Sequence, residues 1–218
     1  MDDETLGWLA AVTEAAGGSS AALVAAAARA GEAPGSCTVV LVEGMSDQAA
    51  VQTLAARHGR DLPGEGVFVV PMGGATNIAH FLGVFGPRGL GVRLAGLCDE
   101  AEEHDFRRGL ERTELGAVPD RASLARLGFF VCVADLEDEM IRSLGVRRVE
   151  RLIEAEGESG PFQTFTKQPA HRGEPREQQL RRFMGTRSGR KVRYGHVLAA
   201  ALDLTQVPGP LAGLLAWA

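Results

Sequence analysis

Short, mostly apolar runs, several of them rich in valine, alternate with longer amphipathic segments over much of the chain. These runs occupy residues 38–42, 66–70, 92–98 and 128–134, and all but 92–98, which contains Arg93, are free of charge. Their length and β-branched content predict buried strands. The segments between them with apolar residues at helical spacing are 47–58, 75–85 and 100–112. Strands that alternate with helices predict an α/β fold, with a central parallel sheet flanked by helices.

The two ends of the chain show no such alternation. Residues 1–35 hold alanine-rich stretches and predict an N-terminal helical extension that packs or dimerises. We expect the sheet-containing core over residues 36–145. Residues 146–218 predict a helical, basic C-terminal region that packs on this core.

The charge of the chain is unevenly distributed. The 218 residues include 23 Lys and Arg and 28 Asp and Glu, for a formal net charge of −5. Nine basic residues oppose two acidic ones over residues 167–193, so this segment carries +7 and the remainder −12. An acidic body with a basic segment is the asymmetry expected of an acidic metal centre that acts on a polyanion.

The sequence shows no signal for secretion or for a membrane. The chain begins with acidic residues, and it has no uninterrupted apolar run of membrane-spanning length. Its three cysteines lack zinc-site spacing, which favours reduced core thiols. A Gly-x-Ser-x-Gly motif is absent, so serine-hydrolase chemistry has no support. We therefore expect a cytoplasmic protein without a membrane partner.

Acidic residues follow three of the four predicted strands. Glu43 follows the first strand, Asp99 the third, and Asp135 with Glu137 the fourth. Asp47 lies in the first turn of the next predicted helix, for which we expect Ser46 to be the cap. The carboxyl ends of parallel strands meet at one edge of a sheet, where ligands usually bind. Because Mg²⁺ and Mn²⁺ prefer carboxylate oxygens, the pattern predicts a metal site.

Two further features favour contacts with phosphate. Gly73 and Gly74 follow the second strand, and paired glycines allow a close backbone approach. The basic segment favours a sequence-tolerant grip on a nucleic-acid backbone, against the alternative of a solvated helix surface. Its candidate contact residues are Arg181, Arg182, Arg187, Ser188, Arg190 and Arg193.

Several of these motifs together resemble a Toprim domain, the Rossmann-like catalytic fold of topoisomerases, bacterial primases and OLD-family (overcoming lysogenization defect) nucleases. The resemblance rests on Glu-Gly-x-x-Asp at residues 43–47, Pro-Met-Gly-Gly at 71–74 with Asn77, and Leu-Cys-Asp at 97–99. The Asp-Leu-Glu segment at 135–137 and Ser-Gly-Arg-Lys at 188–191 resemble the OLD type.

This resemblance implies roles for individual residues. Glu43 would be the acid nearest the chemistry, with Asp47, Asp99 and Glu137 as metal ligands and Asp135 beside them. One or two Mg²⁺ or Mn²⁺ ions would activate water for attack on a phosphodiester. Lys191 would neutralise charge on the phosphate as the second catalytic residue.

The chain departs from the family pattern at two points. The third motif is usually Asp-x-Asp, whereas this chain has Asp99 followed two residues later by Ala101. Glu102 and Glu103 are the candidates to supply the missing carboxylate. No Gly-x-x-x-x-Gly-Lys-Ser/Thr phosphate loop is found, so we expect a stand-alone module whose control by ATP would need a separate ATPase partner.

The leading hypothesis is a metal-dependent endonuclease that cleaves or nicks nucleic acid, with DNA favoured. A nucleotidyl transferase or RNA-processing enzyme is the first alternative, because Toprim acids serve both kinds of chemistry. A non-catalytic module that binds nucleic acid or protein is the second. The alanine-rich N-terminal helices also allow a homodimer.

Overall fold

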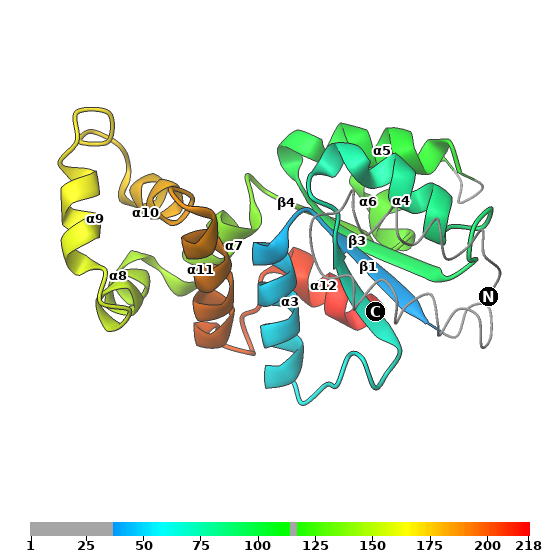
Figure 1. Cartoon of the computed structure of the whole chain (residues 1–218), viewed down its shortest axis with the longest axis horizontal. Helices are drawn as coiled ribbons and strands as arrows, with labels where there is room; N and C mark the ends of the chain where they lie inside the picture. The colour runs from blue at the N-terminus through cyan, green and yellow to red at the C-terminus, as the bar shows by residue number, and fades with distance from the viewer. Residues whose placement is uncertain (1–36, 114–116) are drawn as a thin grey trace.

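A four-stranded parallel sheet forms the centre of the molecule, with strand order β2-β1-β3-β4 (Figure 1). The computed structural model describes residues 37–113 and 117–218, so the extension expected over residues 1–35 lies outside the described residues. The strands are β1 (Thr38–Val42), β2 (Val67–Pro71), β3 (Arg93–Asp99) and β4 (Phe129–Cys132). The α/β sheet predicted from the sequence is confirmed.

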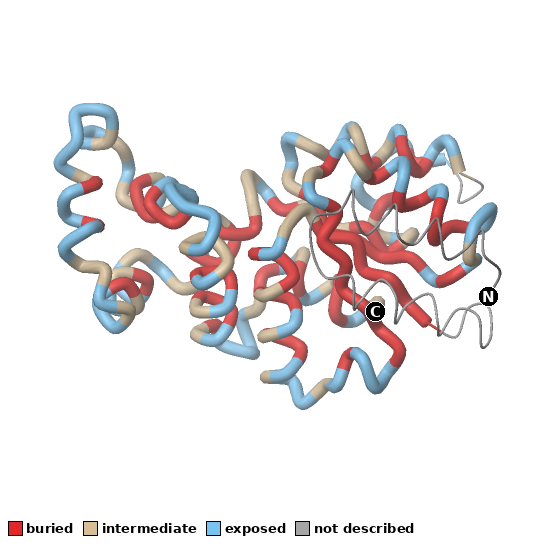
Figure 2. The backbone as a smooth tube through the Cα atoms, viewed as in Figure 1, coloured by how far each residue is buried: buried red, intermediate tan, exposed pale blue. Residues whose placement is uncertain are grey.

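Both faces of the sheet are buried, which explains why its strands are continuous apolar runs (Figure 2). In β1, Val39 and Leu41 belong to one hydrophobic core, and Val40 and Val42 belong to the other. Successive side chains of a strand point to opposite faces, so one run of residues serves both cores.

The first core lies beneath three helices and two short 3₁₀ turns. These elements are η1 (Ala75–Asn77), α4 (Ile78–Phe85), η2 (Glu100–Glu102), α5 (Glu103–Glu111) and α6 (Arg121–Arg126). Phe81 and Phe85 of α4 and Phe106 of α5 are fully buried in this core.

The second core is covered by α3 (Met45–Arg57) and by the helices of the C-terminal half. These helices are α7 (Leu136–Leu144), α8 (Val146–Ala155), α9 (Ser159–Thr166), α10 (Arg176–Met184), α11 (Ser188–Ala201) and α12 (Gly209–Trp217). Helices α8 to α10 extend away from the sheet as a helical arm, α11 returns beside α3, and α12 packs on β3 and β4 (Figure 1). No helix within the described ranges is long and apolar enough to cross a membrane.

Some element boundaries differ from those expected. Helix α3 begins at Met45 with Gly44 as its N-cap, and the expectation that Ser46 is the cap is wrong. The side chain of Asp47, the third residue of the helix, accepts a hydrogen bond of 2.8 Å from the backbone N–H of Gly44. This contact caps the start of the helix in place of a Ser46 side chain. Strand β4 ends at Cys132, two residues early, because Ala134 has a left-handed backbone with φ of 66°.

A close approach between two helices places the first turn of α11 beside the sheet edge. A Cβ atom added to Gly195 of α11 would lie 2.4 Å from the backbone oxygen of Ser46 in α3. Only glycine allows the helices to pack at this distance. Lys191 lies one turn earlier on the same face of α11, so Gly195 also sets how near Lys191 comes to α3.

We expect Gly195→Ala to lower the melting temperature by about 5 °C, because the added methyl group would push the backbone of α11 away from the backbone of α3. Gly189→Ala is the matched control, since a Cβ there would have no neighbour within 4 Å. Differential scanning fluorimetry of both variants measures the difference. Equal melting temperatures for the two would show that the close approach is not required.

Candidate metal centre

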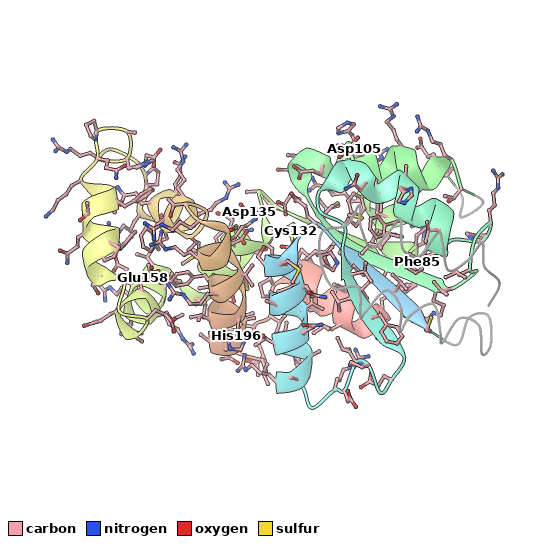
Figure 3. The ribbon with its side chains drawn as sticks, viewed as in Figure 1. Phe85, Asp105, Cys132, Asp135, Glu158 and His196 are labelled. Atoms are coloured by element: carbon pink, nitrogen blue, oxygen red, sulfur yellow. The ribbon has the colours of Figure 1, made fainter. Side chains whose placement is uncertain are left out.

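The carboxyl ends of β1, β3 and β4 bring distant acidic residues to one edge of the sheet. Glu43 directly follows β1, Asp99 is the last residue of β3, and Asp135 lies three residues beyond β4. The edge faces the junction with the helical arm, where Figure 3 places Asp135 and Cys132 near the start of α3.

Three of these carboxylates form a tight cluster. One oxygen from each of Glu43, Asp99 and Glu102 lies within 4.8 Å of the other two. The Oε2 atom of Glu102 is buried and has no hydrogen-bond partner among the described residues. A buried carboxylate oxygen without a donor is costly unless a cation meets it. The cluster therefore fits a hard divalent cation such as Mg²⁺ or Mn²⁺.

Glu102 and Glu103 have different surroundings, although both were candidates to replace the missing acid of the third motif. The carboxylate of Glu103 accepts a hydrogen bond of 2.7 Å from Arg121 Nε and lies 3.7 Å from Arg107. Those contacts hold it on the side of α5, whereas Glu102 joins Glu43 and Asp99.

Lys191 lies among a second group of acids. Its Nζ atom is 3.6 Å from Glu137 Oε2, and the Glu137 side chain is only 3% exposed. Asp47 is also buried, and its carboxylate caps α3 through the Gly44 N–H. Burial lowers the pKa of Lys191, but Glu137, Asp47, Glu43 and Asp99 outweigh it and raise that pKa above its ordinary value. Lys191 therefore stays charged.

Asp135 is fully engaged by protein groups. One carboxylate oxygen accepts a 2.8 Å hydrogen bond from the Asp138 N–H and caps α7, and the other pairs with Arg181 of α10. Arg181, a candidate contact for nucleic acid, thus holds an acid at the sheet edge.

Burial, and after it the neighbouring acids, raises the pKa values of the carboxylates at this edge. Burial, followed by Asp47, Asp135, Glu43 and Glu137, raises the pKa of Asp99 to about 8. Burial raises the pKa of Glu137 to about 7, against the opposing effect of Lys191. The pKa values of Glu43 and Asp47 are also raised, chiefly by burial. The protein places more negative charge here than its own cations neutralise.

The two glycines after β2 adjoin the same edge. Gly73 and Gly74 have φ angles of 73° and 133°, which side chains rarely allow. The Gly74 N–H donates a 3.1 Å hydrogen bond to the backbone oxygen of Glu43. This turn therefore fixes the backbone beside the cluster.

Most of the basic candidates are paired with acids from other segments. Arg190 is 8% exposed, pairs with Glu158 at 2.8 Å and stacks over Phe183, and Arg193 pairs with Glu158 at 2.6 Å. Arg182 pairs with Glu174 at 2.7 Å but keeps about half of its side chain exposed. Arg187 and Ser188 are exposed at the start of α11. Sequence reasoning missed Glu158, since no local pattern marks its place on the helical arm (Figure 3).

Comparison with known proteins relates this fold to the Toprim domains. Residues 36–100, less than half of the chain, match the family model described as "Overcoming lysogenization defect protein-like, TOPRIM domain", so this segment is similar to an OLD-like Toprim domain. None of the curated proteins matches the sequence.

Solved structures of OLD proteins share the fold over most of the chain. The C-terminal region of the Burkholderia pseudomallei OLD protein is 20% identical, with a TM-score of 0.63, and the match covers 83% of this chain and 95% of that one. The C-terminal region of the Xanthomonas campestris pv. campestris OLD protein is 23% identical, with a TM-score of 0.65, and the match covers 83% and 91%. At these identities the likeness shows the fold.

We expect Glu102→Gln to weaken Mn²⁺ binding about tenfold, because it removes charge from the tight cluster. Glu103→Gln is the matched control and should leave the affinity within about twofold, since Glu103 is held by Arg121. Isothermal titration calorimetry of the two variants gives the comparison. A larger loss of Mn²⁺ affinity in Glu103→Gln than in Glu102→Gln would show that Glu103 is the metal ligand.

The metal-free protein should become less stable as the pH rises from about 5 to 8. The folded-state pKa values of Asp99, about 8, and Glu137, about 7, lie above the ordinary value of about 4, so the folded state binds more protons in this window. The free energy of unfolding therefore falls as the pH rises. We expect the melting temperature to fall by about 5 °C over this range.

Thermal denaturation in EDTA across this range measures the slope. Asp99→Asn should flatten the slope, and Mn²⁺ should restore stability most at pH 8, where the carboxylates are ionised. A melting temperature that rises with pH in EDTA would contradict the assignment.

Proposed function

We propose that this chain is a metal-dependent endonuclease that cleaves or nicks DNA by hydrolysis of a backbone phosphodiester. The observation that carries the proposal is the cluster of Glu43, Asp99 and Glu102, with its unpartnered buried oxygen, beside the charged Lys191. An OLD-like Toprim domain is a nuclease-type fold, which supports the same reaction class.

Mg²⁺ or Mn²⁺ would be held by Glu43, Asp99 and Glu102, with Asp47 and Glu137 as the nearest further carboxylates. When bound, such an ion supplies activation of water and neutralisation of charge on the phosphate. One or two ions would balance the excess of acids at this edge.

The side chains of the chain perform the remaining steps. Glu43, which directly follows β1 at the cluster, accepts a proton from the attacking water. Lys191 remains positive and stabilises the negative charge that grows on the phosphate. It lies in the first turn of α11, where free backbone N–H groups add to the attraction for an anion.

The start of α11 also offers a route for the nucleic-acid backbone. Arg187 and Ser188 are exposed there, and the half-exposed Arg182 lies one helix earlier. The turn at Gly73 and Gly74 allows a close backbone approach beside Glu43. Contacts of this kind would be salt-dependent and tolerant of sequence.

Nicking of supercoiled plasmid in Mg²⁺ or Mn²⁺ tests the proposal. Glu43→Gln should lower the rate at least about a hundredfold because it removes the proton acceptor, and Lys191→Ala should do the same because it leaves the phosphate charge unbalanced. Arg108→Ala, which removes an exposed cation from α5, is the control and should cleave at the wild-type rate.

EDTA should stop cleavage, and the melting temperature of each variant in EDTA reports whether it folds. Full activity in Glu43→Gln would remove the proposal. Mn²⁺ binding by a wild-type protein that cleaves no DNA would instead favour the non-catalytic module.

A further inference from the structure

Two exposed apolar side chains lie beside the candidate metal centre. Met45 is 43% exposed and Val133 is 47% exposed. Among the described residues the third large hydrophobic with such exposure is Leu204, at 37%, which follows α11. Single exposed apolar residues are ordinary on a protein surface, so the position of these two beside the acids is what distinguishes them.

The strand order places these two residues on opposite sides of the end of β3. Met45 follows β1 as the first residue of α3, and Val133 directly follows β4. Strand β3, which delivers Asp99 and leads to Glu102, lies between β1 and β4. Neighbouring strands are about 4.8 Å apart, so the two flanking strand ends are separated by about 10 Å.

The turn that contains Val133 includes a backbone conformation that non-glycine residues disfavour. Ala134 is the one non-glycine residue in the described ranges with a positive φ, a conformation that side chains rarely adopt. The Val133 N–H donates a 2.8 Å hydrogen bond to Glu139, and Arg142 holds that carboxylate at 3.0 Å. The backbone is thus fixed while the Val133 side chain faces solvent.

We infer that Met45 and Val133 contact the faces of unstacked bases on the two sides of the scissile phosphate. This inference rests on the proposed function and specifies the form of its substrate. Base faces are the extended apolar surface of a nucleic acid, and they are covered in a stacked duplex. Apolar side chains reach them as wedges that separate adjacent bases, as several DNA-bending proteins do. The enzyme therefore acts on DNA that is locally opened at the cleaved step.

The first experiment compares two DNA substrates of one sequence, a perfect duplex and a duplex with an unpaired bubble at the cleaved step. The double variant Met45→Ser/Val133→Ser should lower kcat/KM on the duplex at least about tenfold, because its side chains no longer offset the free-energy cost of unstacking the bases. On the bubble, where the bases are already free, the change should stay below about threefold. Leu204→Ser is the matched control and should alter neither value.

The second experiment reads the opening directly. A 2-aminopurine base is placed at the cleaved step of the duplex, and binding is followed in Ca²⁺. Its fluorescence should rise with the wild-type protein and not with the double variant, although anisotropy shows that both bind. Mn²⁺ affinity, measured separately, should be the same in both proteins.

The outcomes separate this inference from the proposed function. Equal losses on duplex and bubble, or a wild-type fluorescence that does not rise, would overturn the role of the two side chains and leave the nuclease proposal standing. A wild-type protein that cleaves neither substrate would overturn the proposed function, and the inference would fall with it.

Discussion

Mutual repulsion among carboxylates at the sheet edge is the constraint on which this structure depends. Six acids, from Glu43 to Glu137, share the region with two cations, Lys191 and Arg181. Left alone, such a group would separate or take up protons. Burial, together with the neighbouring acids, accordingly raises the pKa values of Asp99 and Glu137. The rest of the fold must supply the force that holds the acids together.

That force is the burial of two hydrophobic cores on opposite faces of one sheet. Parallel strands fix the acids at one edge, since their carboxyl ends cannot be moved apart without breaking the ladder. The second core also draws α11 against α3, at a distance that Gly195 permits, and so delivers Lys191 from a segment nearly 150 residues beyond Glu43. Packing far from the edge thereby contributes to its chemistry.

The sequence was sufficient to predict the strands and the shared edge, because uncharged β-branched runs and strand–helix alternation are local patterns with one simple solution. It could not choose between Glu102 and Glu103, since that choice depends on Arg121, which lies on a later helix. From the sequence alone, the arginines of residues 167–193 were also expected to be more available for nucleic acid than they are. Arg190 and Arg193 meet Glu158, and Arg181 meets Asp135, through folding of the helical arm. Ion pairs between residues so far apart in the sequence produce no periodic pattern by which they could be predicted.

Several exceptions to ordinary protein architecture gather at the same edge, and they point to the site independently of any family resemblance. An unpartnered buried carboxylate oxygen at Glu102, a left-handed alanine at position 134 and exposed apolar side chains at Met45 and Val133 each carry a cost. Sequences that fold well satisfy local and global preferences together, and departures from them concentrate where function requires it. Because these departures differ in kind, no single packing defect accounts for all of them. A cation at the acids and an apolar ligand surface beside them would relieve both the charge and the exposure at once.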